Sequence, residues 1–148
     1  MPTSQQFKRD LKRSQPLVNW VDGWFQSKGF RTSQTKGKAS YDLRATKVEG
    51  RRLSDYRVEV KYDYRSEDTG NICIERSSLD YSTADIFVIG TIGNAYILSL
   101  NQAKELYKNA DDKRCVGDIS GNWCAIIPKS SLLNIPIIHG VKSQAQAA

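Results

Sequence analysis

Residues 56–64, Y-R-V-E-V-K-Y-D-Y, alternate strictly between apolar or aromatic residues and charged residues. Because successive side chains of a β-strand point to opposite faces, this pattern predicts a half-buried strand with Val58 and Val60 turned toward the core. Glu59 and Lys61 then share the other face, two positions or roughly 7 Å apart along the strand. The stretch therefore presents a carboxylate beside an ammonium group.

A second, shorter alternation lies upstream, where residues 41–46 read Y-D-L-R-A-T. If Leu43 faces the core, Asp42 falls on the opposite face of this strand. Pairing the two strands as a hairpin would gather Asp42, Glu59 and Lys61 into one cluster. Two carboxylates and a lysine are the groups that a hard divalent cation and a phosphodiester require. The plainer interpretation is a Glu59–Lys61 ion pair on a solvated sheet face with Asp42 unrelated, because such surface pairs are common and contribute little.

The pairing of Asp42 with the E-V-K segment Glu59–Lys61 resembles the PD-(D/E)xK nuclease superfamily, which includes restriction endonucleases, Holliday-junction resolvases and some homing endonucleases. The resemblance extends over about residues 7–100, in the order of the elements as well as in the motif. Tyr41 stands where the motif has its proline. The resemblance implies an α/β fold with a restriction-endonuclease-like core, in which a mixed β-sheet is flanked by helices.

The resemblance also implies the chemistry of a Mg²⁺-dependent endodeoxyribonuclease, with Mn²⁺ as a substitute metal. Asp42, Glu59 and Lys61 would be the catalytic residues, and Asp42 and Glu59 would also be the metal ligands. Glu75 would support the site without binding the metal. In many members of the superfamily the first helix donates an acidic residue to the metal site, and the sequence leaves open which of Asp10, Asn19 and Asp22 would take this place.

The net charge of +6 is concentrated in one part of the chain. Residues 1–40 hold eight Lys or Arg against two Asp, whereas the remaining residues hold fourteen charges of each sign. A localised basic excess suits a polyanion, with nucleic acid the first candidate, an anionic membrane the second and a solubilising surface the plain alternative. Together with the acidic cluster, it predicts double-stranded DNA as the partner. The candidate DNA contacts are Lys8, Arg9, Lys12, Arg13, Lys36, Lys38, Arg51 and Arg52.

Several functions are compatible with this combination of a DNA partner and a metal site. One small site cuts one strand, so cutting both strands requires two sites and predicts a homodimer or a larger homo-oligomer. Small size and the lack of a separate recognition domain make a site-specific homing endonuclease the first interpretation, followed by a restriction enzyme or a Holliday-junction resolvase. A non-catalytic nucleic-acid-binding module would keep salt-dependent affinity without needing metal. A structural or interaction protein would show no such affinity.

The chain is expected to form one nuclease domain over residues 1–139, with a disordered tail at 140–148. A basic helix at residues 4–15 is expected to end at Pro16, and a second helix to run from there until Gly29 stops it. A polar loop follows, and the hairpin turn is expected at residues 49–52. Further strands are predicted at residues 71–76, 85–92, 95–100 and 123–127. Asn101 is expected to cap a helix at 102–109, before a charged loop at 111–114.

The sequence also bears on the cellular compartment. No apolar run approaches the roughly 20 residues of a membrane span, and residues 1–13 lack the apolar segment of a secretory signal. The three cysteines are widely spaced and form no C-x-x-C pair, which favours reduced thiols over a zinc site. We therefore expect a cytoplasmic protein of bacterial or phage type that has no membrane partner.

Overall fold

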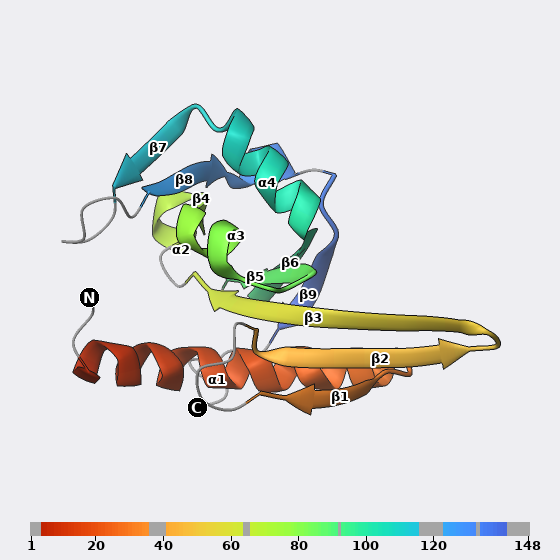
Figure 1. Cartoon of the computed structure of the whole chain (residues 1–148). Coiled ribbons are helices and arrows are strands. Elements are labelled where there is room, and N and C mark those ends of the chain that lie inside the picture. The colour runs from red at the N-terminus through yellow and green to blue at the C-terminus, as the bar shows by residue number, and fades with distance from the viewer. Residues whose placement is uncertain are drawn as a thin grey trace.

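The structure is a computed structural model that describes residues 4–35, 41–63, 66–91, 93–115, 123–132 and 134–141. In these ranges the strands form two sheets (Figure 1). The larger sheet has the order β1-β2-β3-β5-β6-β9, from β1 (Arg31–Gln34), β2 (Leu43–Glu49), β3 (Arg52–Tyr62), β5 (Ile86–Gly90), β6 (Gly93–Ser99) and β9 (Ile137–Val141). The smaller sheet has the order β4-β8-β7, from β4 (Asn71–Glu75), β8 (Trp123–Pro128) and β7 (Asp112–Cys115).

The helices lie on both sides of the larger sheet. They are α1 (Ser4–Ser27), α2 (Ser66–Thr69), α3 (Arg76–Tyr81), α4 (Leu100–Asn109) and the short 3₁₀ helix η1 (Lys129–Leu132). Helix α1 packs along one face of β1, β2 and β3, whereas α4 packs on β5 and β6 on the other side, together with α3 and the smaller sheet (Figure 1). Strands β3 and β5 run parallel and the other neighbours run antiparallel. The predicted mixed sheet flanked by helices is therefore confirmed.

Strands β2 and β3 form the predicted antiparallel hairpin, in which Leu43 is opposite Val58. Gly50 in the turn has a φ of 61°, a conformation that glycine adopts without steric cost. The paired strands project past α3 and α4 as a two-stranded ribbon (Figure 1). Val58 is fully buried and Val60 nearly so, as the alternation in this stretch predicts.

Two hydrophobic cores pack against opposite faces of the larger sheet. One core joins α1 to the sheet through residues that include Leu17, Val21, Phe25 and Val58. The other lies between the sheet and the layer of α3, α4 and the smaller sheet. Neighbouring residues of β5 enter different cores, which explains why this segment is apolar on both faces. β5 is thus the strand of the larger sheet that is buried on both faces.

The N-terminal helix differs from its prediction. Pro16 lies inside one continuous helix, α1, and does not separate two helices. A proline in a helix loses one backbone hydrogen bond, and here the burial of the following turn offsets that loss, since Leu17 is fully buried. The helix ends as expected at Gly29, whose φ is 90°. The N–H of this glycine donates to the Gln26 carbonyl at 2.9 Å.

The other differences concern polar segments. Arg31–Gln34 and Asp112–Cys115 were expected to be loops but form the edge strands β1 and β7. The cap of α4 is Ser99 instead of Asn101, and its hydroxyl accepts the Gln102 N–H while the Gln102 side chain accepts the Ser99 N–H. β9 extends to Val141, so the start expected for the tail at Gly140 lies within a strand. Residues 142–148 lie outside the described residues.

Candidate active site

Asp42 lies directly before β2 and is held against β3 by two hydrogen bonds. Its backbone N–H donates to the Val58 carbonyl at 2.9 Å. Its Oδ2 accepts the N–H of Val60 at 2.8 Å. The residue between these two partners is Glu59, so the hairpin places the two carboxylates side by side, as the sequence predicts. Both bonds join Asp42 directly to the main chain of β3.

Glu59 and Lys61 occupy the face of β3 that points away from α1. Their partners on the parallel strand β5 are Phe87 and Ile89, which belong to the core on that side. The Glu59 side chain is only 16% exposed, whereas that of Lys61 is 45% exposed. Lys61 Nζ lies 3.6 Å from Glu59 Oε1, which is an ion pair at a distance too long for a hydrogen bond. The three predicted catalytic residues are therefore brought together.

The second carboxylate oxygen of Glu59 is the most informative atom in the site. Oε2 is buried and has no hydrogen-bond partner among the described residues. Leaving a buried acceptor unsatisfied costs roughly 1–3 kcal/mol, and more for a charged group. This free-energy cost disappears when a bound ligand interacts with the buried oxygen. A cation beside Asp42 and Glu59 would do so.

The electrostatics of the two carboxyl groups follow from their burial. Burial raises the pKa of Asp42, against smaller opposing effects of the Val60 N–H and the charge of Lys61. Burial likewise raises the pKa of Glu59, against opposing effects of Lys61 and of the Ser82 hydroxyl, while the neighbouring charge of Asp42 raises it further. Both groups thus hold protons more tightly than ordinary carboxyls. A divalent cation would favour their ionised forms.

These shifts predict an unusual stability change for Glu59→Gln. A carboxyl group whose pKa is raised in the folded state stabilises the protein when the pH is below the ordinary pKa of 4.5. That contribution to stability is lost as the pH rises through the raised pKa. At neutral pH without divalent metal, removing the charge should therefore raise the Tm. The gain should shrink as pH falls toward the ordinary pKa. Thermal unfolding in EDTA at several pH values measures this.

The matched control is Glu105→Gln, which removes an exposed carboxylate on α4 that accepts a hydrogen bond from Asn109. It should leave the Tm nearly unchanged at every pH, because exposed charges of this kind contribute little. A lower Tm for Glu59→Gln at neutral pH would mean that the Glu59 charge is stabilising, and would contradict the unsatisfied-carboxylate interpretation.

Glu75 reaches the same neighbourhood from the smaller sheet. It ends β4 and, together with Lys61, lines a cavity of about 210 Å³. The wall of this cavity includes the polar residues Asp63 and Ser78 and otherwise consists largely of apolar side chains. Asp42 and Glu59 do not line it. Glu75 is thus placed near the lysine, from a different sheet than the carboxylate pair.

Asn19 and Asp22 are the candidates on the first helix whose side chains are described, and neither lies in the cluster of Asp42, Glu59 and Lys61. The side-chain amide of Gln34 on β1 donates to Asn19 Oδ1 at 3.0 Å and to Asp22 Oδ2 at 2.8 Å. They lie on the α1 side of the sheet, opposite Glu59. The side chain of Asp10 lies outside the described residues. Among the described residues, no group of three or more His, Cys, Asp or Glu side chains is arranged to hold a metal.

The candidate DNA contacts fall into three sets. Arg51 and Arg52 are exposed at the end of the β2–β3 hairpin, as predicted. Lys36 and Lys38 lie outside the described residues. The other four belong to the first part of α1, and their side chains are likewise outside what the structure describes: Lys8, Arg9, Lys12 and Arg13.

Sequence reasoning missed Ser82, whose hydroxyl lies near the Glu59 carboxylate and lowers its pKa against the larger effect of burial. Ser82 follows α3 and reaches β3 only through tertiary packing, so nothing in its local sequence marks it. It also missed the role of Tyr41, whose ring lies 5.9 Å from the Arg57 guanidinium carbon. This residue directly precedes Asp42 and places its ring beside an arginine of β3.

Comparisons with known proteins add little to this geometry. No protein-family model matches the sequence, and no curated protein matches it. Among solved structures, the chain is similar to a bacterial homing endonuclease, with 17% identity and a TM-score of 0.47 over 70% of this chain and 74% of that one. Within the described residues, no helix is both long and apolar enough to span a membrane. Any function has to be inferred from the site itself.

Proposed function

We propose that this protein is a metal-dependent endonuclease that hydrolyses phosphodiester bonds in double-stranded DNA. The observation that carries the proposal is the pairing of two partly buried carboxyl groups, Asp42 and Glu59, beside the half-exposed ammonium of Lys61. An isolated ion pair on a solvated face would not bury its glutamate or leave one glutamate oxygen unsatisfied. The plain surface-pair interpretation is therefore the weaker of the two.

The residues fit a hard divalent cation. Mg²⁺ prefers oxygen ligands and commonly takes one or two carboxylates, completing its shell with water and substrate phosphate. Asp42 and Glu59 would hold the cation, and Oε2 of Glu59, which accepts no hydrogen bond among the described residues, would be available as a metal ligand. When bound, Mg²⁺ or Mn²⁺ supplies Lewis-acid activation of water and of the phosphate.

Lys61 performs the other part of the chemistry. Its ammonium has three N–H donors, and its partial exposure leaves them accessible to a substrate. It neutralises negative charge that develops on the phosphate and orients the attacking water by a hydrogen bond. The ion pair with Glu59 holds the lysine at the carboxylates before substrate arrives. The main-chain bond from Val60 fixes Asp42 in the same way.

The finer biological role is also a proposal. A site-specific homing endonuclease acting as a homodimer or larger homo-oligomer is our first choice, with restriction or Holliday-junction resolution as alternatives. Two copies are required because one such site cuts one strand. The protein would act in the reducing cytoplasm of a bacterium or a phage-infected cell. None of the three cysteines, Cys73, Cys115 and Cys124, forms a disulfide bond in the described part of the chain.

The test is nicking of supercoiled plasmid with Mg²⁺, with Mn²⁺ and with EDTA, for the wild type and Glu59→Ala in parallel. We expect metal-dependent cutting by the wild type and none by the variant, because the variant lacks one of two metal-binding carboxylates. Glu105→Ala is the matched control, since it removes an exposed carboxylate on α4 and should cut like the wild type. Mixed genomic DNA is included as a second substrate for an enzyme with a rare target.

The outcomes separate the candidate functions. Equal cutting by the wild type and Glu59→Ala would remove Glu59 from the mechanism. Salt-sensitive binding without cutting of either substrate would favour the non-catalytic nucleic-acid-binding module. If the protein neither binds nor cuts DNA, Glu59 and Lys61 are an ordinary ion pair without a role in catalysis.

A further inference from the structure

One face of the β1–β2–β3 part of the larger sheet is open. Helix α1 covers the other face of these strands, while α3, α4 and the smaller sheet cover β5 and β6 (Figure 1). The side chains on the open face follow from the register, because residues directly opposite in antiparallel strands point the same way. This open face is continuous along β3 with the candidate active site.

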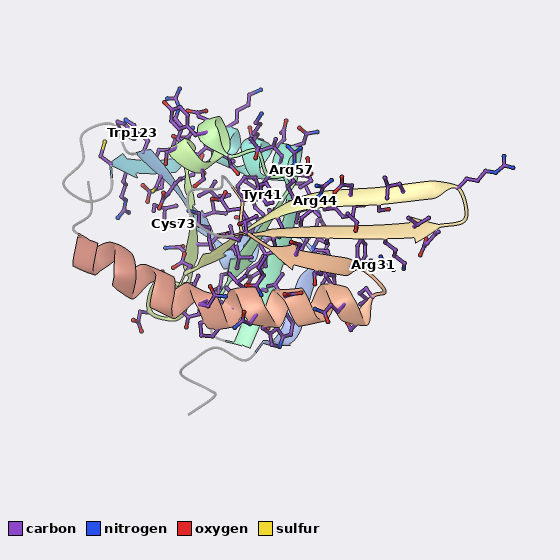
Figure 2. All side chains as sticks on the ribbon, turned by 60° about the horizontal axis from the view of Figure 1, so that its bottom comes forward. Arg31, Tyr41, Arg44, Arg57, Cys73 and Trp123 are labelled. Carbon is purple, nitrogen blue, oxygen red and sulfur yellow. The ribbon has the colours of Figure 1, made fainter. Side chains whose placement is uncertain are left out.

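The open face carries three exposed arginines in adjacent rows. Ser33, Arg44 and Arg57 form one row across β1, β2 and β3. Arg31 begins the next row, in which it is opposite Thr46. All three arginines are exposed, and Figure 2 shows them on these neighbouring strands. Arg57 precedes Glu59 by two residues, so it lies roughly 7 Å from the carboxylate site along the same face.

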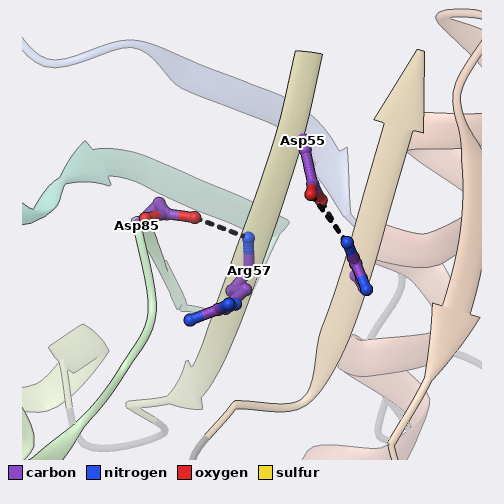
Figure 3. A network of polar contacts seen from close by, with 4 residues as sticks. Asp55, Arg57 and Asp85 are labelled. Atoms are coloured by element: carbon purple, nitrogen blue, oxygen red, sulfur yellow. Dashed lines mark hydrogen bonds and ion pairs between the residues drawn. The ribbon is translucent and has the colours of Figure 1, made fainter. Parts of the chain in front are cut away.

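The acids near these arginines do not neutralise them all. Asp55 accepts two hydrogen bonds from the Arg44 guanidinium, at 2.9 and 2.7 Å, in an exposed pair that a phosphate would have to displace or extend. The Asp85 carboxylate accepts the main-chain N–H of Arg57 at 2.9 Å, and not its guanidinium (Figure 3). Among the described residues, neither Arg57 nor Arg31 forms an ion pair with a carboxylate. The guanidinium of Arg57 instead lies over the Tyr41 ring.

The far end of the same face carries an exposed apolar pair. Val48 and Leu53 are opposite each other in the hairpin and are 70% and 63% exposed. Exposed Arg51 and Arg52 adjoin them at the turn. A two-stranded β-ribbon fits the major groove of B-DNA, where apolar side chains can contact thymine methyl groups. Basic residues at the turn suit the flanking phosphates.

We propose that duplex DNA lies along this open face, with Arg31, Arg44 and Arg57 contacting phosphates next to the site of cleavage. The end of the β2–β3 hairpin enters the major groove beyond them. Charge complementarity carries the choice of occupant, since Arg31 and Arg57, which form no ion pair among the described residues, lie on the same face as a candidate phosphodiesterase site. This inference rests on the proposed nuclease function and names the surface that presents its substrate.

The test compares a triple variant, Arg31→Gln, Arg44→Gln and Arg57→Gln, with the wild type. Fluorescence anisotropy with labelled mixed-sequence duplex DNA in EDTA gives Kd at several salt concentrations. Each phosphate that the protein no longer neutralises flattens the slope of log K against log salt by about 0.9, so the triple variant should have a slope flatter by up to about 2.7. The control variant Lys104→Gln, Lys108→Gln and Arg114→Gln removes the same charge from exposed positions on α4 and β7, and should keep the wild-type slope.

Circular dichroism and light scattering accompany the binding curves. If the triple variant unfolds, Arg57→Gln alone is used, since it keeps the main-chain bond to Asp85, and a slope flatter by about 0.9 is expected. A folded variant with the wild-type slope overturns the proposed surface, even where the wild type cuts DNA. A changed oligomeric mass with an unchanged slope also overturns it, in favour of an interface between copies. If the slope flattens although the wild type never cuts plasmid or genomic DNA, the surface is supported and the nuclease function fails.

Discussion

Changing Lys61 to alanine is expected to lower the rate of DNA cleavage by about 100- to 10,000-fold while leaving affinity for duplex DNA nearly intact. A positioned group that orients water or neutralises the transition state contributes a factor of this size. The side chain is 45% exposed, and within the described part of the chain its ion pair is with Glu59, so its removal should not disturb the fold. Single-turnover cleavage with saturating metal, alongside anisotropy in EDTA, separates the two effects.

Two further variants sharpen this prediction. Lys61→Arg keeps the positive charge, but its planar guanidinium cannot reproduce a compact ammonium, so only part of the activity should return. Lys104→Ala removes an exposed lysine from α4 and should cleave like the wild type. Full activity in Lys61→Ala would exclude the lysine from the chemistry. An equal reduction of binding and cleavage would instead assign it to DNA affinity.

The second large effect concerns stability, at the end of β5. Gly90→Ala should lower the free energy of unfolding by about 1–3 kcal/mol, the usual cost of overpacking a core. A Cβ at position 90 would overlap the side chain of Leu17, which is fully buried where α1 packs on the sheet. The φ of Gly90 is not positive, so the cost arises from packing and not from the backbone. Denaturant unfolding monitored by circular dichroism measures it.

Two variants test the cause. Gly23→Ala is the matched control, because its Cβ would meet nothing within 4 Å at a position inside α1, four residues before the helix ends. It should stabilise the protein by up to about 1 kcal/mol, since alanine favours the helix over glycine. Leu17→Ala alone should cost about 2–5 kcal/mol. Combined with Gly90→Ala it should cost less than the sum of the two, because it removes the overlap. Strict additivity would contradict the proposed overlap.

The hairpin and its carboxylate cluster could be predicted because both depend on short-range rules. The period of two in residues 56–64 sets the faces of β3, and Gly50 sets the turn. Once Leu43 and Val58 both face inward, Asp42 has to lie beside Glu59. The long apolar run of β5 and the Gly29 stop of α1 are equally local signals. None of these elements needed knowledge of a distant partner.

Other features depend on partners far away in the chain, and no local pattern specifies them. The polar segment Arg31–Gln34 becomes a strand because β2 offers it a free edge to pair with. Cys73 and its neighbours in β4 pair with β8, and so leave the larger sheet altogether. Pro16 stays helical because Leu17 is buried beneath the sheet. In each case tertiary pairing or burial outweighs the intrinsic preference of the segment.

The same division applies to the site. The sequence specifies Asp42, Glu59 and Lys61 as a cluster, since the residues that assemble it belong to one hairpin. Folding in three dimensions adds the burial that raises the pKa of both carboxyls, and brings Ser82 to Glu59. It also aligns the exposed arginines of separate strands with the carboxylates. Burial and cross-strand register are properties of packed layers, and therefore cannot be read from the spacing of residues along one strand.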